Sequence, residues 1–224
     1  MHFLDRRHAG RTLAAQLAPL ADERPVVIAL PRGGVPVGAE VARLLDAPLE
    51  ILAVRKLGAP GNPELGVGAI VEDGTAVLDE RSAGAVGMTQ AMLEETVARE
   101  ASELQRRVAS YRGDRPRLPI SGRTVVLVDD GLATGLSDLA AVRAVRKQNA
   151  SRVIVAVPVG SSEAVRMLAE EADDVVCLLT PHVLFGVGLW YDDFSTVDDE
   201  QVIFLLREAR EREGDGRPQP ERTV

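Results

Sequence analysis

The sequence predicts an α/β fold in which a parallel, twisted sheet is covered by helices on both faces. Short runs of β-branched residues without charge, such as residues 26–30 and 125–128, are typical of strands that are buried on both faces. These runs alternate with segments of helical periodicity, and that alternation favours parallel strands joined by helices. The 224 residues are 46% hydrophobic and 27% charged, which is ordinary usage for a globular chain able to bury a full core.

The elements can be predicted in order from periodicity and turn residues. Residues 1–20 form an amphipathic pattern with Leu13 and Leu17 on one face, and Asp73-Gly74 marks a hairpin turn. From Leu93 to Tyr111 apolar residues recur every three or four positions, which predicts a long inserted helix over about 88–112. The other expected elements are strands at 26–30, 49–54, 67–71, 76–78, 125–128, 153–157 and 175–179, with helices at 37–45, up to about 149, 162–171 and 200–213.

Domain organisation is expected to be simple. Residues 1–200 are predicted to form a single domain, with a small hood or cap at 180–198, followed by the helix at 200–213. The segment 214–224 is rich in Gly, Pro and charge and is expected to be disordered.

The most informative segment is 124–137, TVVLVDDGLATGLS. Asp129 and Asp130 follow a buried strand and therefore lie at its carboxyl end, where open α/β sheets bind ligands. The small residues that follow offer backbone N–H groups and hydroxyls at the start of a helix that Ser137 or Asp138 can cap, an arrangement that binds anions. Two carboxylates beside such a cradle suit a ribose 5-phosphate.

This segment resembles the 5-phosphoribosyl 1-pyrophosphate (PRPP) signature of type I phosphoribosyltransferases. Gly131 differs from the branched apolar residue usual in that family, and Ala133 stands where hypoxanthine-guanine enzymes carry an aspartate that assists proton removal. The site is therefore more similar to the adenine, orotate or uracil branches, and any general base must come from elsewhere. LPRGGVPVG, VRKLGAPGNPELGVGA and LWYDDF are similar to a group of bacterial phosphoribosyltransferases of unassigned acceptor.

The resemblance implies a role for each motif residue. Arg55, Lys56, Asp129 and Asp130 form the expected catalytic set, and the residues expected to bind PRPP are Arg32, Gly33, Gly34, Lys56, Asp129, Asp130, Ala133, Thr134, Gly135, Leu136 and Ser137. Mg²⁺ is expected to be held mainly by PRPP and water, with Asp129 or Asp130 as an alternative direct ligand.

Two further segments are expected to cover the ligand. Residues 57–66 hold several glycines and prolines without regular periodicity, which predicts a loop long enough to act as a lid. The hood contains the candidate acceptor-binding residues Trp190, Tyr191, Asp192 and Asp193. Packing of the same aromatic side chains as a cap on the sheet is the alternative.

Charge and composition limit the classes of partner. A net charge of −8 gives no support to a nucleic-acid partner. An apolar stretch of membrane-spanning length is absent from the sequence, so no membrane partner is expected and a cytoplasmic location is predicted. The single cysteine, Cys177, lies in an apolar run, which favours an inert thiol over a nucleophile.

The resemblance implies a homodimeric, PRPP-dependent transferase of nucleotide salvage that acts on a small-molecule nitrogen acceptor such as a nucleobase. The alternative is a PRPP-sensing regulator with little or no transferase activity. A hydrolase or a dinucleotide-binding dehydrogenase has less support, because GxSxG and a strand-linked GxGxxG are both absent from the sequence.

Overall fold

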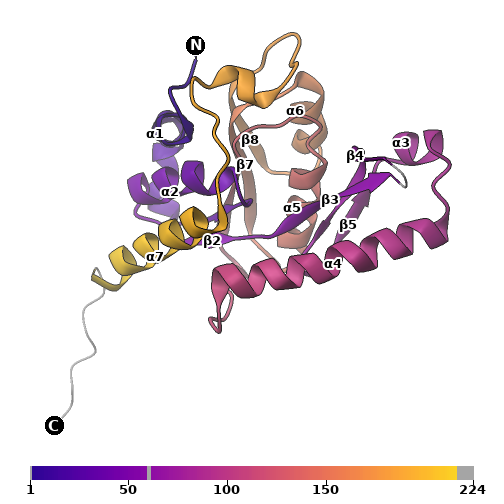
Figure 1. Cartoon of the computed structure of the whole chain (residues 1–224). Helices are drawn as coiled ribbons and strands as arrows, with labels where there is room; N and C mark the ends of the chain where they lie inside the picture. The colour runs from indigo at the N-terminus through magenta and orange to yellow at the C-terminus, as the bar shows by residue number, and fades with distance from the viewer. Residues whose placement is uncertain (1, 60–61, 216–224) are drawn as a thin grey trace.

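A five-stranded parallel sheet forms the centre of the molecule (Figure 1). The computed structural model describes residues 2–59 and 62–215. Neighbouring strands in the order β2-β1-β6-β7-β8 all pair in parallel, which confirms the predicted sheet. The strands are β1 Val26–Ala29, β2 Leu49–Ile51, β6 Thr124–Val128, β7 Arg152–Val159 and β8 Asp174–Leu179.

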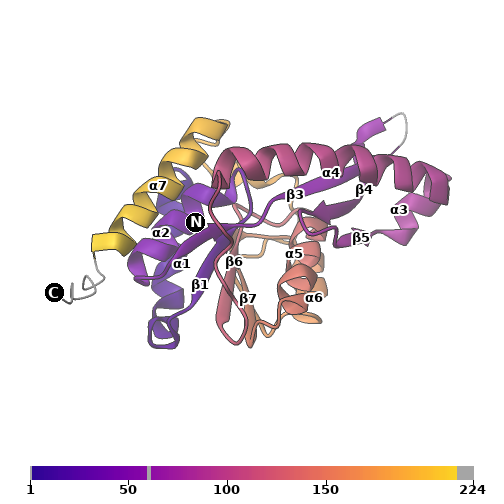
Figure 2. The ribbon, with the colours of Figure 1, turned by 90° about the horizontal axis from the view of Figure 1, so that it is seen from below.

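Helices cover both faces of this sheet, as Figures 1 and 2 show. One face carries α1 Arg6–Leu17, α2 Gly34–Leu44 and α7 Asp199–Asp215, and the other carries α5 Leu136–Lys147 and α6 Ser162–Ala169. Successive residues of a strand point to opposite faces, so Val27 packs in the cluster with α1 and α2 whereas Ile28 packs in the cluster with α5. Both faces of the central strands are therefore core, which explains their unbroken apolar sequences.

The strand predicted at 49–54 is in fact divided between two sheets. β2 ends at Ile51, and β3 Val54–Ala59 begins a separate antiparallel sheet with β4 Asn62–Val71 and β5 Ala76–Leu78. The predicted hairpin about Asp73-Gly74 joins β4 to β5 and is confirmed.

The prediction of a loop at 57–66 is wrong, because most of this segment forms the β3–β4 hairpin. Pro60 and Gly61, at the centre of the segment, lie outside the described residues. Leu57, which is fully buried, pairs with Gly68. A Cβ on Gly68 would lie 2.3 Å from the carbonyl oxygen of Val77, so glycine is what allows β5 to approach. Here a residue typical of loops is required by strand packing, which composition alone cannot reveal.

The remaining elements extend or flank this frame. The helix predicted over 1–20 begins at Arg6 after the N-cap Asp5 and is followed by the 3₁₀ helix η1 Ala18–Glu23, and a second 3₁₀ helix, η2 Val187–Trp190, lies in the hood. α7 includes Gly214 and Asp215, which the sequence had assigned to the tail, and the rest of the expected tail, 216–224, lies outside the described residues. Among the helices described, none has both the length and the apolar character needed to span a membrane.

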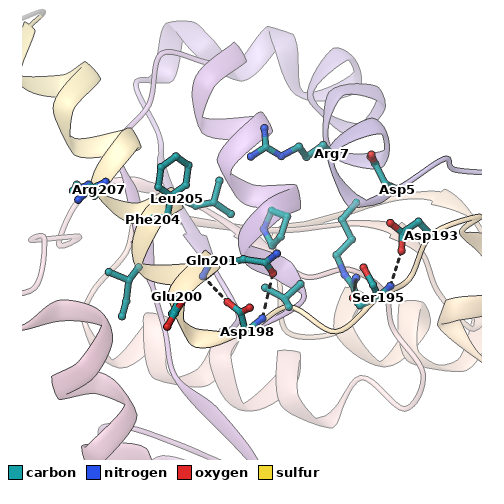
Figure 3. Close-up of a pocket in the computed structure, with 14 residues that line it drawn as sticks. Asp5, Arg7, Asp193, Ser195, Asp198, Glu200, Gln201, Phe204, Leu205 and Arg207 are labelled. Carbon is teal, nitrogen blue, oxygen red and sulfur yellow. Dashed lines mark hydrogen bonds between the residues drawn. The ribbon is translucent and has the colours of Figure 1, made fainter.

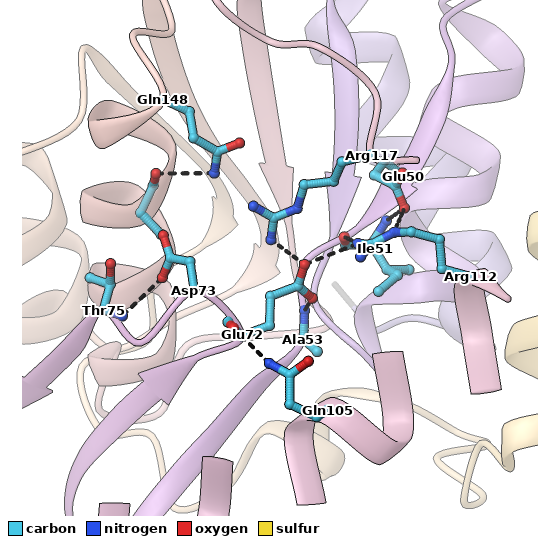
Figure 4. Close-up of polar contacts among 11 residues, drawn as sticks. Glu50, Ile51, Ala53, Glu72, Asp73, Thr75, Gln105, Arg112, Arg117 and Gln148 are labelled. Atoms are coloured by element: carbon cyan, nitrogen blue, oxygen red, sulfur yellow. Dashed lines mark hydrogen bonds and ion pairs between the residues drawn. The ribbon is translucent and has the colours of Figure 1, made fainter. Parts of the chain in front are cut away.

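The small sheet packs against α3 Glu80–Ala85 and α4 Gln90–Arg112, and α4 runs along it back to the core (Figure 2). The cluster of charged side chains in Figure 4 connects the small sheet and α4 to β2 of the central sheet. Glu72 accepts hydrogen bonds from the backbone N–H of Ala53 at 3.0 Å and from Arg112 at 3.1 Å, and it also pairs with Arg117. Arg112 lies 3.5 Å from Glu50 of β2. The side chains of Glu72 and Arg112 are only 6% and 9% exposed, so each charge depends on its partner.

We predict that Glu72→Gln lowers the free energy of unfolding by about 3 kcal/mol, because Arg112 and Arg117 lose a buried countercharge while the side-chain volume is kept. Urea unfolding monitored by circular dichroism measures the change. Glu103→Gln is the matched control, since its partners Arg106 and Arg107 lie at the surface of α4 and water screens their charges. Equal shifts for the two variants would contradict the role given to the buried cluster.

Candidate functional site

The site lies where the loops that follow β1 and β6 meet. β1 and β6 are adjacent, but β1 leads to β2 on one side of the sheet and β6 leads to β7 on the other, and such a switch point leaves a crevice at the carboxyl ends of the strands. The two loops are in close contact. A Cβ on Gly34 would lie 2.6 Å from the carbonyl oxygen of Val128, and one on Gly33 would lie 1.9 Å from Oδ2 of Asp130. A side chain at position 34 would therefore meet backbone, and one at position 33 would displace the Asp130 carboxylate; the peptide bond before Arg32 in the same loop is cis.

Asp129 and Asp130 lie at this edge in different environments. The Oδ1 atom of Asp129 accepts a 2.7 Å hydrogen bond from the backbone N–H of Asp130, while Oδ2 of Asp130 accepts a 2.8 Å bond from Nε of Arg6. Burial raises the pKa of Asp129 well above its usual value, and the charges of Asp138 and Asp130 raise it further. Burial also raises the pKa of Asp130, but the hydrogen bond and charge of Arg6 oppose that rise. Arg6 therefore favours the ionised form of Asp130.

Asp138 is a third acid beside this pair. It lies in the first turn of α5, is 3% exposed, and among the described residues its Oδ1 atom has no hydrogen-bond partner. Burial raises its pKa from 3.8 to about 7, and the charge of Asp130 adds to the rise. The sequence had offered Asp138 or Ser137 as the cap of this helix. The N-cap is instead Gly135, in the left-handed conformation with φ of 76°, and no side chain caps it.

The loop 133–137 forms one wall of a cavity of about 710 Å³. The first N–H groups of α5 have no partner within the helix, so they are available to an anion at this wall. Ser161 holds the loop by donating a 2.8 Å hydrogen bond to the carbonyl oxygen of Ala133. The opposite wall comes from the small sheet, and the lining residues relevant here are Lys56, Leu65, Gly66, Ala133, Thr134, Leu136 and Ser137. The exposed Lys56 places a positive charge near the acids, which opposes the rise in the pKa of all three but does not cancel it.

The structure separates the predicted cations Arg55 and Lys56. They are neighbours on β3, so their side chains leave opposite faces of the strand. Arg55 binds Glu100 of α4 at 2.9 Å through Nε and 2.7 Å through an Nη atom, and it does not line the cavity. Arg32 lies 3.7 Å from Asp199 at the start of α7 and remains about one-third exposed. The structure thus brings together Asp129, Asp130, Lys56 and the loops 32–34 and 133–137, whereas Arg55 points away from them toward α4.

Comparison with known proteins agrees with this geometry. A family model described as the phosphoribosyl transferase domain matches residues 5–193. The chain belongs to this family.

Two proteins of Mycobacterium tuberculosis, from strains CDC 1551 and H37Rv, are each named "putative phosphoribosyl transferase" and are 47% identical to the chain over 210 residues. These residues make up 93% of the chain and 47% of each relative, so the chain spans about half the length of the curated relatives it matches. A crystal structure of a Thermus thermophilus protein is 49% identical, with a TM-score of 0.78, and the match covers 93% of this chain and 99% of that one. The family and fold predicted from the sequence are therefore confirmed.

The hood of this phosphoribosyl transferase domain packs on the acids. Tyr191 is 5% exposed, donates a 2.6 Å hydrogen bond to the backbone carbonyl of Asp130, and lies with its ring centre 5.4 Å from that of Phe3. Burial raises the pKa of the Tyr191 hydroxyl, which keeps it a donor. A Cβ on Gly131 would lie 2.5 Å from Cγ1 of Val187, so the glycine that departs from the family pattern leaves room for the hood.

The other candidate acceptor residues have contacts of their own. Asp192 lies 2.7 Å from His2, and Asp193 accepts a 2.9 Å hydrogen bond from the backbone N–H of Ser195. Trp190 is partly buried against the cluster that contains Phe3 and Tyr191. These contacts agree with the packing alternative for the hood, and an acceptor role stays a prediction.

Sequence reasoning missed two residues of the site. Arg6 reaches Asp130 across 124 positions of the chain, and no local pattern marks such a contact. Asp138 carried a local signal that was interpreted as a cap, although the apolar residues after it, Leu139 and Ala140, indicate that this turn of the helix is buried. Within the described residues, no group of three or more His, Cys, Asp or Glu side chains is arranged to hold a metal ion.

A second cavity of about 640 Å³ lies between α1, α2 and α7 (Figure 3). Arg6 and Arg7 line it on one side and Phe204 and Arg207 on the other. The loop before α7 is fixed by the bond within Asp193–Ser195 and by a 2.7 Å bond from the backbone N–H of Gln201 to Asp198, both drawn in Figure 3. Arg6 therefore lies between this cavity and the acids.

We predict that Asp138→Asn makes the protein more stable at pH 8 but not at pH 4. The folded state raises the pKa of Asp138 from 3.8 to about 7, so it binds a proton more tightly than the unfolded state does. The wild type therefore loses stability as the pH rises through this window, by up to about 4 kcal/mol, whereas the neutral amide does not. Urea unfolding of both proteins at the two pH values measures the difference.

Asp79→Asn is the control of opposite sign, because a hydrogen bond from Ser82 lowers the pKa of Asp79. The ionised Asp79 stabilises the fold at neutral pH, so its amide variant should be less stable than the wild type at pH 8. An Asp138→Asn variant whose stability follows pH as the wild type does would refute the assignment.

Proposed function

We propose that the protein is a PRPP-dependent phosphoribosyltransferase that transfers ribose 5-phosphate to a nitrogen acceptor and releases pyrophosphate. The observation that carries this proposal is the position of Asp129 and Asp130 at the switch point of the sheet. They lie there between the loop 133–137, which leads into α5, and the loop of Gly33 and Gly34 that follows β1. Membership of the phosphoribosyl transferase family supports it.

Each part of PRPP has a complementary surface in this arrangement. The 5′-phosphate fits the loop 133–137, where unpaired N–H groups at the start of α5 face the cavity. The 2′ and 3′ hydroxyls are donors and fit the carboxylates of Asp129 and Asp130, which follow directly on β6. The pyrophosphate fits the loop of Arg32, Gly33 and Gly34, and Lys56 adds a positive charge near Asp129 and Asp130.

The proposed reaction breaks the bond between C1′ and the pyrophosphate oxygen and forms a bond from the acceptor nitrogen to C1′ with inversion. The transition state has oxocarbenium character, so charge complementarity and positioning of the reactants are the main contributions to catalysis. No covalent nucleophile is needed. Oxygen ligands suit Mg²⁺, and the adjacent carboxylates of Asp129 and Asp130 after β6 are the protein groups that would contact an ion held mainly by PRPP and water. When bound, the ion would neutralise the leaving pyrophosphate.

We predict that Asp129→Asn combined with Asp130→Asn weakens PRPP binding by roughly 2–4 kcal/mol, since each charge-assisted hydrogen bond contributes about 1.5–3 kcal/mol and neighbouring losses do not add. Calorimetry with Mg²⁺ and PRPP measures the affinity, and release of pyrophosphate with a panel of purines, pyrimidines and amines measures the reaction. Asp114→Asn is the control, because Asp114 is exposed beyond the end of α4.

An unchanged affinity in a folded double variant would contradict the ribose assignment. Tight binding of PRPP without release of pyrophosphate for any acceptor would instead favour the regulator that senses PRPP.

We further propose that the acceptor binds under the hood, with Trp190 as the stacking surface. Trp190→Ala should then weaken acceptor binding by about 1–3 kcal/mol, because an indole stacks on a planar base, and should change PRPP affinity little. If Trp190 is only a packing residue, its removal should cost about 3–5 kcal/mol of stability. The melting temperature and the acceptor KM of this one variant distinguish the two roles.

A further inference from the structure

The segment before α1 is built into the site. Residues 2–5 run beside the hood: the N–H of Phe3 donates to the carbonyl of Trp190 at 2.9 Å, and the N–H of Asp192 donates to the carbonyl of Phe3 at 2.8 Å. Phe3 is completely buried against Tyr191. These contacts fix the start of α1, so the side chain of Arg6 is delivered to a defined place.

Arg6 makes three contacts there, and only 11% of its side chain is exposed. Its Nε donates to Oδ2 of Asp130 at 2.8 Å, and one Nη atom donates to the carbonyl oxygen of Ser195 at 2.8 Å. The guanidinium carbon lies 3.8 Å from the ring centre of Phe194. One planar cation thus joins an acid of the sheet edge to two residues at the end of the hood.

These contacts orient the carboxylate of Asp130. Oδ2 is held by Arg6, whereas no other residue in the described part of the chain donates a hydrogen bond to Oδ1. One oxygen is therefore fixed by the protein and the other is left for a ligand. Burial raises the pKa of Asp130, and the hydrogen bond and positive charge of Arg6 oppose that rise.

We propose that Arg6 is a positioning residue of the PRPP site: by binding one oxygen of Asp130 it orients the other toward the ribose hydroxyls. This inference rests on the proposed function. It predicts that Arg6 acts on PRPP affinity only through Asp130, because the guanidinium is occupied by Asp130, Ser195 and Phe194.

Calorimetry with Mg²⁺ and PRPP tests the proposal on the full chain. Arg6→Gln should raise the Kd for PRPP by roughly ten- to 100-fold, the range expected for loss of one charge-assisted hydrogen bond. Arg6→Lys, which keeps the charge but loses the planar fork, should recover part of the loss. In an Asp130→Asn background, Arg6→Gln should have little further effect.

Arg7→Gln is the matched control. Arg7 is the next residue of α1, is exposed, lines the outer cavity of Figure 3, and forms no ion pair within the described residues, so its replacement should leave the Kd unchanged. Melting temperatures of all variants show which are folded. If Arg6→Gln does not fold, Arg6→Lys with and without Asp130→Asn provides the same comparison.

The outcomes separate the inference from the function on which it rests. A wild-type protein that does not bind PRPP would overturn the proposed function and the inference with it. If the wild type binds, equal affinities of folded Arg6 and Arg7 variants would overturn the inference alone. Tighter binding by Arg6→Gln would also overturn it, because Arg6 would then compete with the ribose for Asp130.

Discussion

The contact between Gly33-Gly34 and the acids after β6 is the constraint on which the site depends. Adjacent parallel strands end at the same edge of a sheet, so the two loops must either meet or be held apart by side chains. A Cβ at Gly33 would meet Oδ2 of Asp130 at 1.9 Å, and the substitution would therefore displace the acid as well as the loop. Because Arg6 binds that same oxygen atom, the contact between the N-terminal helix and Asp130 also depends on the absence of a side chain at position 33.

Charge is the second constraint, and it opposes stability. Burial raises the pKa of Asp129, Asp130 and Asp138, and the charge of Asp130 adds to the rise at the other two. Their positive partners come from the two extremes of the site: Arg6 from the N-terminal helix and Lys56 from the small sheet. A fold that served only stability would place apolar residues here, as it does along the rest of β6, where all of Thr124–Val128 is buried. The cost of these acids is a physical reason for the proposal that this edge binds a ligand.

The sequence predicted the parts of this site that follow from local patterns. Apolar runs identified β1 and β6, and the acids and glycines after them identified the candidate ligand-binding edge of the sheet. The β3–β4 hairpin was not predictable, because residues 57–66 have the glycine and proline content typical of a loop and no strand periodicity, so only the fold shows that Leu57 pairs with Gly68. The Arg6 contact and the Arg55–Glu100 pair were missed for a different reason: both join residues far apart in the chain, so only the folded topology brings them together.

Hydrogen bonds and apolar packing join the hood to Asp130 and Gly131, at the edge of the sheet that is proposed to bind the ribose. Tyr191 holds the backbone of Asp130, Arg6 holds its carboxylate and the carbonyl of Ser195, and Val187 fills the space above Gly131. A hood that opened widely would break these contacts, and each hydrogen bond contributes about 0.5–1.5 kcal/mol, or more where Arg6 is charged. Release of the hood would therefore also release Asp130, the residue proposed to hold the ribose. Acceptor binding and PRPP binding would then both depend on the closed hood. If binding of one of these ligands closes the hood, it strengthens binding of the other, and the coupling free energy is the same in both directions.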